Sequence, residues 1–153
     1  MIRVSRLVPV LVFVLVAAAS SAAAQGVTPD PERAAARQVI LQLAADVQAG
    51  KWPSADSLFA TRGVHILADT LGLHAWAQYR DSQLKPDLAR YSNLRVAHTG
   101  VEATVRGNVA WVAFRQEISG TPTSGPAQRI GRGTAVLEKL EGRWTIVHLH
   151  ISR

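Results

Sequence analysis

Between residues 30 and 50, apolar side chains recur at intervals of three and four, which is the period of one face of an α-helix. They are Ala36, Val39, Ile40, Leu43 and Val47. Asp30 precedes this stretch as a candidate N-cap, Pro31 suits the first helical position, and Gly50 is a natural C-terminal stop. The pattern predicts an amphipathic helix between Asp30 and Gly50.

Shorter elements are expected before the pattern changes to strands. Trp52-Pro53 opens a short helix over 53–59, and the alternating stretch 63–67 predicts a strand. One face of a further helix consists of Leu73, Trp76, Ala77, Arg80 and Leu84. This helix is expected to stop near Lys85, because Pro86 disfavours helical geometry in the residue before it. A further turn over 86–91 can follow the kink.

From Asn93 onward the chain consists of long segments with the alternation typical of β-strands. Four strands are predicted, over 94–105, 109–119, 129–140 and 143–152. The connections are rich in turn-forming residues: Gly107-Asn108, the loop 120–128 and Glu141-Gly142. Helices first and an antiparallel sheet last, within one domain, indicate an α+β fold with the helices covering one face of the sheet.

The N-terminal 24 residues carry the pattern of a targeting segment. It comprises Arg3 and Arg6, the apolar run 7–19, and the small residues Ala22 and Ala24 at A-x-A positions. This predicts a secretory signal peptide over 1–24, cleaved after Ala24, then a short leader over 25–29 and one domain over 30–153. The apolar run, about 13 residues, is shorter than the roughly 20 that a spanning helix needs. We therefore expect an exported protein, periplasmic or secreted.

The composition is that of a single globular domain, with 48% hydrophobic and 18% charged residues among 153. The sequence has no cysteine, which excludes disulfides, thiol nucleophiles and zinc–cysteine sites. Removal of residues 1–24 takes away Arg3 and Arg6 and no acid, so the net charge falls from +6 to +4. The remaining basic residues contain no run of three, so neither a nucleic-acid partner nor a membrane partner after cleavage is expected.

Local motifs for dinucleotide, phosphate-loop, serine-hydrolase and zinc-protease sites are absent from the sequence, and no cofactor is expected. Gly131-Arg132-Gly133 lies inside a predicted strand. It therefore indicates a bulge or a close backbone approach rather than a phosphate loop. Arg132 either binds an anionic ligand or is simply exposed near the loop.

Two segments carry a resemblance to a known family. They are Trp76-Ala77-Gln78-Tyr79-Arg80-Asp81 and the ending Gly133-Thr134 … Gly142-Arg143-Trp144-Thr145-Ile146-Val147-His148-Leu149-His150-Ile151-Ser152. Both resemble the nuclear transport factor 2-like superfamily, in its SnoaL-like and ketosteroid-isomerase-like branch; the ending also resembles the association domain of calcium/calmodulin-dependent kinases. Over about residues 30–153, the resemblance implies a cone, in which a curved antiparallel sheet wraps around the N-terminal helices and leaves an apolar cavity open at one end. It also implies a homodimer formed through the outer face of the sheet.

Enzymes of this branch generally use an aspartate in the cavity, often together with a tyrosine. The catalytic candidates here are Asp81 as general base and Tyr79 as hydrogen-bond donor, provided that a dry pocket raises the pKa of the carboxylate. The alternative is structural. Residues two apart on a helix do not face the same way, and Arg80 or Lys85 can pair with Asp81 at the surface.

His148 and His150 are two apart on a predicted strand and therefore share a face with Trp144, Ile146 and Ser152. Two imidazoles so placed can be structural, can line a pocket, or can hold a metal. A third metal ligand would have to come through the fold from His65, His74 or His98. No metal site is predicted.

The strand over 109–119 has one apolar face and one mixed face. The apolar face carries Val112, Phe114 and Ile118, whereas the mixed face carries Trp111, Ala113, Arg115 and Glu117. The mixed face is either a pocket wall or an outer surface with an ion pair. The pocket candidates are Trp76, Tyr79, Trp111, Arg115, His148 and His150.

Two functional hypotheses follow. In the first, the exported domain binds a small, largely apolar molecule in its cone, as a binder or as a cofactor-free isomerase, cyclase or dehydratase. In the second, it is a non-catalytic association module that forms a homodimer or docks another exported protein through its sheet. The sequence identifies neither the ligand nor a catalytic residue.

Overall fold

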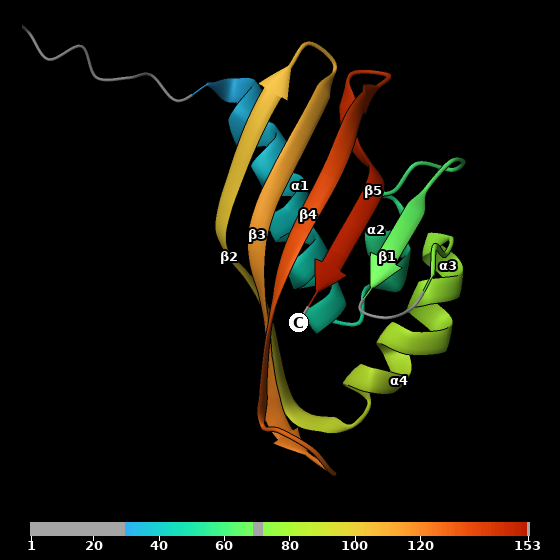
Figure 1. The fold of residues 1–153 in the computed structure, drawn as a ribbon, viewed down its shortest axis with the longest axis vertical. Helices are drawn as coiled ribbons and strands as arrows, with labels where there is room; N and C mark the ends of the chain where they lie inside the picture. Colours follow the sequence, from blue (N-terminus) through green and yellow to red (C-terminus); the bar gives the residue numbers. More distant parts are fainter. Residues whose placement is uncertain (1–29, 69–71, 153) are drawn as a thin grey trace, which may run out of the picture.

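The computed structural model describes residues 30–68 and 72–152 (Figure 1). The predicted signal peptide over 1–24 and the leader over 25–29 lie outside the described residues. The helices are α1 (Pro31–Gln48), α2 (Trp52–Asp56), α3 (Trp76–Tyr79), the π-helix η1 (Arg80–Leu84) and α4 (Lys85–Leu88). The strands are β1 (His65–Ala68), β2 (Tyr91–Arg106), β3 (Val109–Pro122), β4 (Gln128–Leu140) and β5 (Arg143–Ser152).

The strands form one curved sheet in the order β1-β5-β4-β3-β2 (Figure 1). The last four are an antiparallel meander, as predicted, whereas β1 pairs with β5 in parallel, so the sheet is mixed rather than wholly antiparallel. Helix α1 lies across one face of the sheet, and the helical segment α3-η1-α4 stands beside β1. The α+β cone is thereby confirmed.

Helix α1 begins where the sequence predicts it. The Asp30 carboxylate accepts hydrogen bonds from the backbone N–H groups of Glu32 and Arg33, at 3.0 and 3.4 Å. Past the other end, Gly50 adopts a φ of +65°, a conformation that glycine reaches without steric cost. The buried face includes Ala36, Ile40, Leu43, Ala44 and Val47, together with Asp46, whose carboxylate accepts hydrogen bonds from Gln42 and Ser54.

Helix α2 is shorter than the predicted helix over 53–59. The backbone of Leu58 accepts a hydrogen bond from the Ile146 N–H at 2.8 Å, and the Ala60 N–H donates to the Ile146 carbonyl at 3.0 Å. Phe59 therefore forms an isolated bridge with β5. Pairing with the sheet satisfies these backbone groups in an extended conformation, which ends the helix at Asp56.

The helix predicted to stop near Lys85 continues to Leu88 through Pro86. The Lys85 N–H donates to the Arg80 carbonyl, five residues back, so the chain makes a wider π-helical turn there. Pro86 then occupies the first turn of α4, where its missing N–H is tolerated. The buried face of this segment is Trp76, Tyr79, Leu84 and Leu88, whereas Leu73 and Ala77 of the predicted face are exposed.

Strand β5 contains a β-bulge that changes which side chains face the core. Val136 of β4 pairs with His148, but the next residue, Leu137, pairs with Ile146, which leaves Val147 without a partner in the ladder. Trp144 and Ile146 before the bulge are buried, and so are Leu149 and Ile151 after it. His148 and His150 consequently face away from the core, and the predicted common face with Trp144 and Ile146 is wrong.

The glycines of Gly131-Arg132-Gly133 permit close approaches, one of the two alternatives expected from the sequence. Gly133 lies opposite Phe114 of β3, and a Cβ on Gly133 would overlap the Phe114 ring. Phe114, Val112 and Ile118 are buried on the inner side of the sheet, as predicted from their alternation. Within the described residues, no helix has the length and apolarity to cross a membrane.

Candidate functional site

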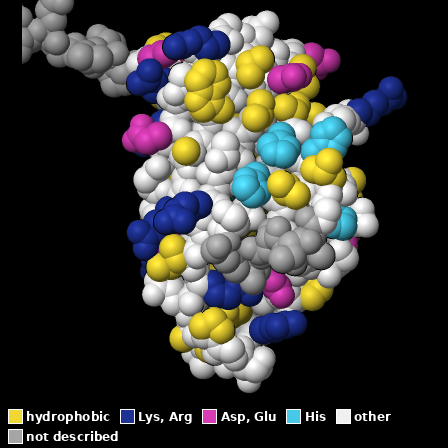
Figure 2. Space-filling view, viewed as in Figure 1, with side chains coloured by type: hydrophobic (Ala, Val, Ile, Leu, Met, Phe, Trp, Pro, Cys, Tyr) yellow, Lys and Arg dark blue, Asp and Glu magenta, His cyan; other side chains and the backbone are white. Residues whose placement is uncertain are grey.

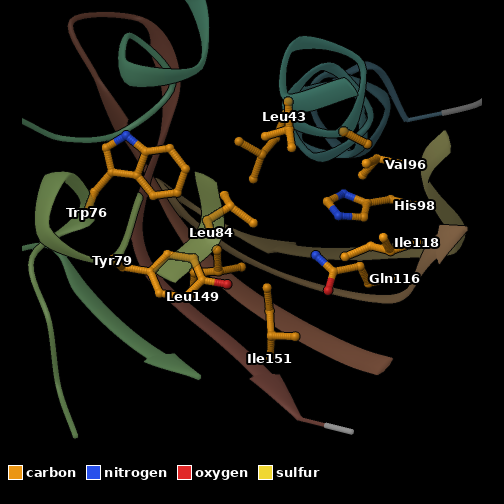
Figure 3. Close-up of a pocket in the computed structure, with 12 residues that line it drawn as sticks. Leu43, Trp76, Tyr79, Leu84, Val96, His98, Gln116, Ile118, Leu149 and Ile151 are labelled. Atoms are coloured by element: carbon orange, nitrogen blue, oxygen red, sulfur yellow. The ribbon is translucent and has the colours of Figure 1, made fainter. Parts of the chain in front are cut away.

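An apolar cavity lies between α1, the inner face of the sheet and the helical segment α3-η1-α4 (Figure 3). Its lining consists of Leu43, Ala44, Val47, Trp76, Tyr79, Leu84, Val96, His98, Gln116, Ile118, Leu149 and Ile151. The free space is about 20 Å³, close to what one water molecule requires. The cavity is thus formed but nearly filled by its own side chains.

His98 is the most distinctive group in the lining. Its side chain comes from β2 and is only 7% exposed. Nδ1 lies 2.9 Å from the Ile40 carbonyl oxygen of α1. Because a carbonyl oxygen only accepts, Nδ1 carries the proton and Nε2 is left with a lone pair. Figure 3 shows the ring edge directed into the cavity.

The surroundings keep this imidazole neutral. Burial lowers the pKa of His98 from 6.5 to about 4, against the smaller opposing effect of its hydrogen bond to Ile40. The ring also packs against Phe114, with ring centroids 4.4 Å apart. Among the described residues, Nε2 has no hydrogen-bond partner. At neutral pH it is therefore an uncharged acceptor facing an apolar space.

Two further polar side chains enter the cavity. Gln116 lies directly opposite His98 in the β2–β3 register, so their side chains are neighbours on the inner face. Tyr79 enters from the other side, on α3, and its ring packs beside Trp76 with centroids 6.2 Å apart. The Trp76 indole is in turn fixed by stacking on Phe59 and by a 2.7 Å hydrogen bond from Nε1 to Asp56.

Asp81 lies outside this constellation. Its carboxylate accepts hydrogen bonds from Arg80 and, at 2.7 Å, from Lys85, and its side chain is 50% exposed. Hydrogen bonds from Arg80 and then Lys85 hold the pKa of Asp81 well below its usual range, the opposite of what a general base needs. The structure therefore places Tyr79 in the cavity wall and Asp81 on the surface, in the ion pair that was the structural alternative.

Of the other pocket candidates, only Trp76 lines the cavity. Trp111 and Arg115 lie on the outer face of β3, with 44% of the Trp111 surface exposed. His148 and His150 are on the outer face of β5 because the bulge at Val147 reverses the alternation. In the β1–β5 register His65 lies opposite His148, yet no group of three potential ligands among the described residues is arranged to hold a metal.

His98 and Gln116 were absent from the pocket candidates, although each has a signal in the sequence. Gln116 is the one polar interruption between Phe114 and Ile118, on a face that is otherwise apolar. His98 follows Val96 by two residues and so shares its face, but the register shift between Thr99 and Glu102 interrupts the alternation that would have shown this. In both cases the sequence signal for a cavity residue is a polar side chain on an otherwise apolar face.

Comparison with known proteins gives a family and a fold. The sequence profile of the family described as "SnoaL-like domain" matches residues 36–153. A protein of Shewanella frigidimarina, provisionally named a ketosteroid isomerase, is 24% identical, with a TM-score of 0.66 over 77% of this chain and 94% of its own. A provisionally named dehydratase of the nuclear transport factor 2-like family, from Streptomyces avermitilis, is 18% identical, with a TM-score of 0.66 over 82% and 97%.

A nuclear transport factor 2-like superfamily protein of Salmonella enterica is similar at 18% identity, with a TM-score of 0.62 over 78% of this chain and 91% of its own. At these identities the likeness shows the fold alone. No functionally curated protein has significant sequence similarity to the chain.

Proposed function

The chain belongs to the SnoaL-like family, and from that premise we propose that it binds a small, largely apolar molecule with one hydroxyl or N–H group in the cavity beneath the sheet. The observation that carries this proposal is the lone pair of His98 Nε2, which faces the cavity without a hydrogen-bond partner among the described residues. Apolar walls with one or two convergent polar groups are typical of small-molecule sites.

His98 gives the site its selectivity. Nε2 has no hydrogen-bond partner among the described residues, so a ligand that donates a hydrogen bond to it gains that bond. An otherwise similar ligand without the donor does not. Gln116, beside His98, offers both an acceptor and a donor, and the apolar remainder of the ligand contacts Leu43, Ile118 and Ile151.

Binding requires the cavity to widen, because about 20 Å³ is too small for an organic molecule. The sheet and α1 form the main body of the core, whereas Trp76, Tyr79 and Leu84 come from the short helical segment that closes the side. The π-turn of this segment marks where a helix departs from its regular ladder, as is frequent at functional sites. We propose that this segment moves outward to admit the ligand.

The family includes isomerases and dehydratases, and for any such chemistry in this cavity we propose His98 rather than Asp81 as the group that holds the substrate. No carboxylate is among the lining residues that the structure describes. In a cofactor-free isomerase, cyclase or dehydratase reaction here, His98 would hold a donor group of the substrate through Nε2, in place of Asp81. Its lowered pKa makes it a hydrogen-bond acceptor rather than a general base at neutral pH.

A matched ligand pair tests the proposal. Phenol and toluene have nearly the same size, and only phenol donates a hydrogen bond. We expect phenol to bind more tightly, on the order of fivefold, since a neutral hydrogen bond contributes about 1 kcal/mol. The shifts of the Leu43, Ile118 and Ile151 methyl groups in NMR titrations report the binding.

Two variants make the result decisive. His98→Asn places an amide N–H near the position of Nδ1, which preserves the bond to Ile40, and deletes Nε2; the preference for phenol should disappear. Leu84→Ala enlarges the cavity and should strengthen binding of both compounds. Phenol that shifts no cavity methyl group in either the native protein or Leu84→Ala would refute the site.

The outer face of the sheet supports the second candidate, a homodimer. Trp111 and Val109 are exposed large apolar residues on β3, at 44% and 39%. If they form the contact, Trp111→Glu should convert a dimer into a monomer in light scattering, whereas Arg62→Glu, in the loop after α2, should not. A native protein that is already monomeric would exclude this candidate.

We also propose export, from the pattern of residues 1–24. N-terminal sequencing of the protein from its own host should give a chain that begins at Gln25. A chain that retains the apolar run over 7–19 would contradict cleavage after Ala24.

A further inference from the structure

A second hollow lies on the outer face of the sheet, where β3, β4 and β5 run side by side. It is lined by Arg115, Ile130, Gly131, Arg132 and Ser152 and encloses about 250 Å³. Arg115 and Gln116 are neighbours in sequence, as are Ile151 and Ser152, and in each pair one residue lines the inner cavity and the other lines this hollow. The two sites therefore lie on opposite faces of the same strands.

The hollow brings two positive charges together. Arg115 and Arg132 are directly opposite each other in the β3–β4 register. Like charges in this position destabilise a sheet unless an anion compensates them. Arg132 is exposed and forms no ion pair with a carboxylate among the described residues. Among the described residues, no carboxylate therefore balances the positive charge of Arg132.

The carboxylate beside Arg115 leaves most of that guanidinium available. Glu117 lies 3.4 Å from Nε of Arg115, and the same carboxylate oxygen accepts a hydrogen bond from Thr99 at 3.0 Å. The terminal nitrogens of Arg115 take no part in this contact, and 56% of its side chain is exposed. The two terminal nitrogens of Arg115 and the guanidinium of Arg132 therefore remain free to bind an anion.

A close approach of two strands completes the hollow. Ser152 pairs with Arg132 in the β4–β5 register. A Cβ on Gly131 would lie 2.8 Å from the Ser152 carbonyl oxygen, so glycine allows the end of β5 to lie close to β4. This brings the Ser152 hydroxyl, a further hydrogen-bond donor, to the side of the two arginines.

We propose that this hollow binds a small oxyanion, a phosphate or carboxylate group, between Arg115 and Arg132. A guanidinium presents parallel N–H donors that match two oxygens of such a group, and Arg is favoured wherever this bidentate recognition is used. The hollow is large enough for an inorganic phosphate or a short carboxylic acid. Ile130 provides an apolar wall beside the anion.

The test is an NMR titration of the purified protein with sodium phosphate at constant ionic strength, balanced with sodium chloride. We expect the backbone amides of Arg115, Gly131, Arg132 and Ser152 to shift together and to saturate. Arg132→Gln should weaken phosphate binding on the order of tenfold or more, as expected for loss of charge-assisted hydrogen bonds. Arg62→Gln removes the same charge from the exposed loop after α2 and should leave the affinity unchanged.

Two further measurements distinguish the charge of Arg132 from its planar geometry, and a phosphate site from a carboxylate site. Arg132→Lys keeps the charge and loses the planar fork, so it should also weaken binding; full affinity in this variant would contradict bidentate recognition. Sodium acetate in place of phosphate distinguishes a carboxylate site, if acetate binds at least as tightly, from a phosphate site. Amides that fail to saturate with either anion, or an equal loss in Arg62→Gln, would overturn the proposal.

Discussion

The two faces of the β-sheet place similar residues in opposite chemical settings. On the inner face, His98 is buried, anchored to Ile40 and surrounded by apolar side chains, and burial lowers its pKa to about 4. On the outer face, His148 has neighbours of its own kind, and its pKa is lowered by burial and then by the nearby charges of His150 and His65. Position relative to the sheet therefore decides whether a histidine is a neutral acceptor in a dry cavity or a partly exposed member of the group of histidine side chains on the outer face (Figure 2).

The same contrast separates the two proposed sites. The inner cavity has apolar walls and the lone pair of His98 Nε2, which favours an uncharged donor ligand. The outer hollow has two arginines and a hydroxyl, which favours an anion. Neighbouring residues along β3 and β5 line opposite sites, so substitutions at adjacent positions should differ strongly in their effects on binding and on stability.

The largest expected effect concerns the faces of β5. Leu149 is 1% exposed, and Leu149→Ala should lower the free energy of unfolding by about 3 kcal/mol, the usual result of deleting a buried leucine side chain. His150→Ala, one residue further on the outer face, should cost about 1 kcal/mol or less. Urea denaturation measures both. A larger loss in His150→Ala than in Leu149→Ala would contradict the bulge at Val147.

The second effect is a dependence of folding stability on pH, which originates from His98 in the cavity. The unfolded chain binds a proton at a histidine pKa of 6.5, whereas folded His98 resists protonation down to about 4. Between these values the unfolded state holds more protons, so stability should fall as the pH is lowered from 6.5 to 4, by up to about 3 kcal/mol from His98.

The matched variant isolates this contribution. His98→Asn does not titrate, so its stability should depend less on pH in that window than that of the native protein. His148 contributes in the same direction in both proteins and cancels in the difference. Parallel pH curves from urea denaturation of the two proteins would show that His98 is not held neutral.

The third effect tests the close packing of the inner face. A Cβ on Gly133 would overlap the Phe114 ring, so Gly133→Ala should destabilise the fold by about 2 kcal/mol through displacement of that ring. Thr134→Ala, the adjacent position on the outer face, should change stability by about 0.5 kcal/mol or less. Thermal unfolding followed by circular dichroism compares the two, and equal shifts would contradict the contact.

The smallest effect is expected at the residue that first suggested catalysis. Asp81 is exposed and paired with Arg80 and Lys85, so Asp81→Asn should leave the preference of the cavity for phenol over toluene unchanged. The same NMR titration measures it. Loss of that preference would show that Asp81 takes part in ligand binding.

The fold was largely predictable, because long runs of alternation and a well-capped helix determine it. The errors occur where a single residue departs from a regular pattern. The π-turn carried the helix past Pro86, and the bulge at Val147 reversed the faces of β5. Neither has a clear local signal in the sequence. The bulge depends on how β5 pairs with β4, and the π-turn depends on how the helix accommodates one extra residue.

The site was less predictable for the same reason. Trp76 and Tyr79 were identified from a resemblance, and the structure places both in the cavity. His98 and Gln116 are brought together only by the β2–β3 register, which sequence spacing does not reveal. Trp111 and Arg115 were assigned to a face that was either a pocket wall or an outer surface, and the structure shows the outer surface.

A long-range proton–nitrogen NMR spectrum of the histidine rings reports directly whether His98 is a neutral acceptor inside a ligand cavity. We expect His98 to carry its proton on Nδ1 from pH 7 down to pH 5, and saturation with phenol to move the Nε2 resonance toward that of a hydrogen-bonded nitrogen. A proton on Nε2, titration of His98 near pH 6.5, or an Nε2 signal unaffected by phenol that shifts the cavity methyl groups would contradict it.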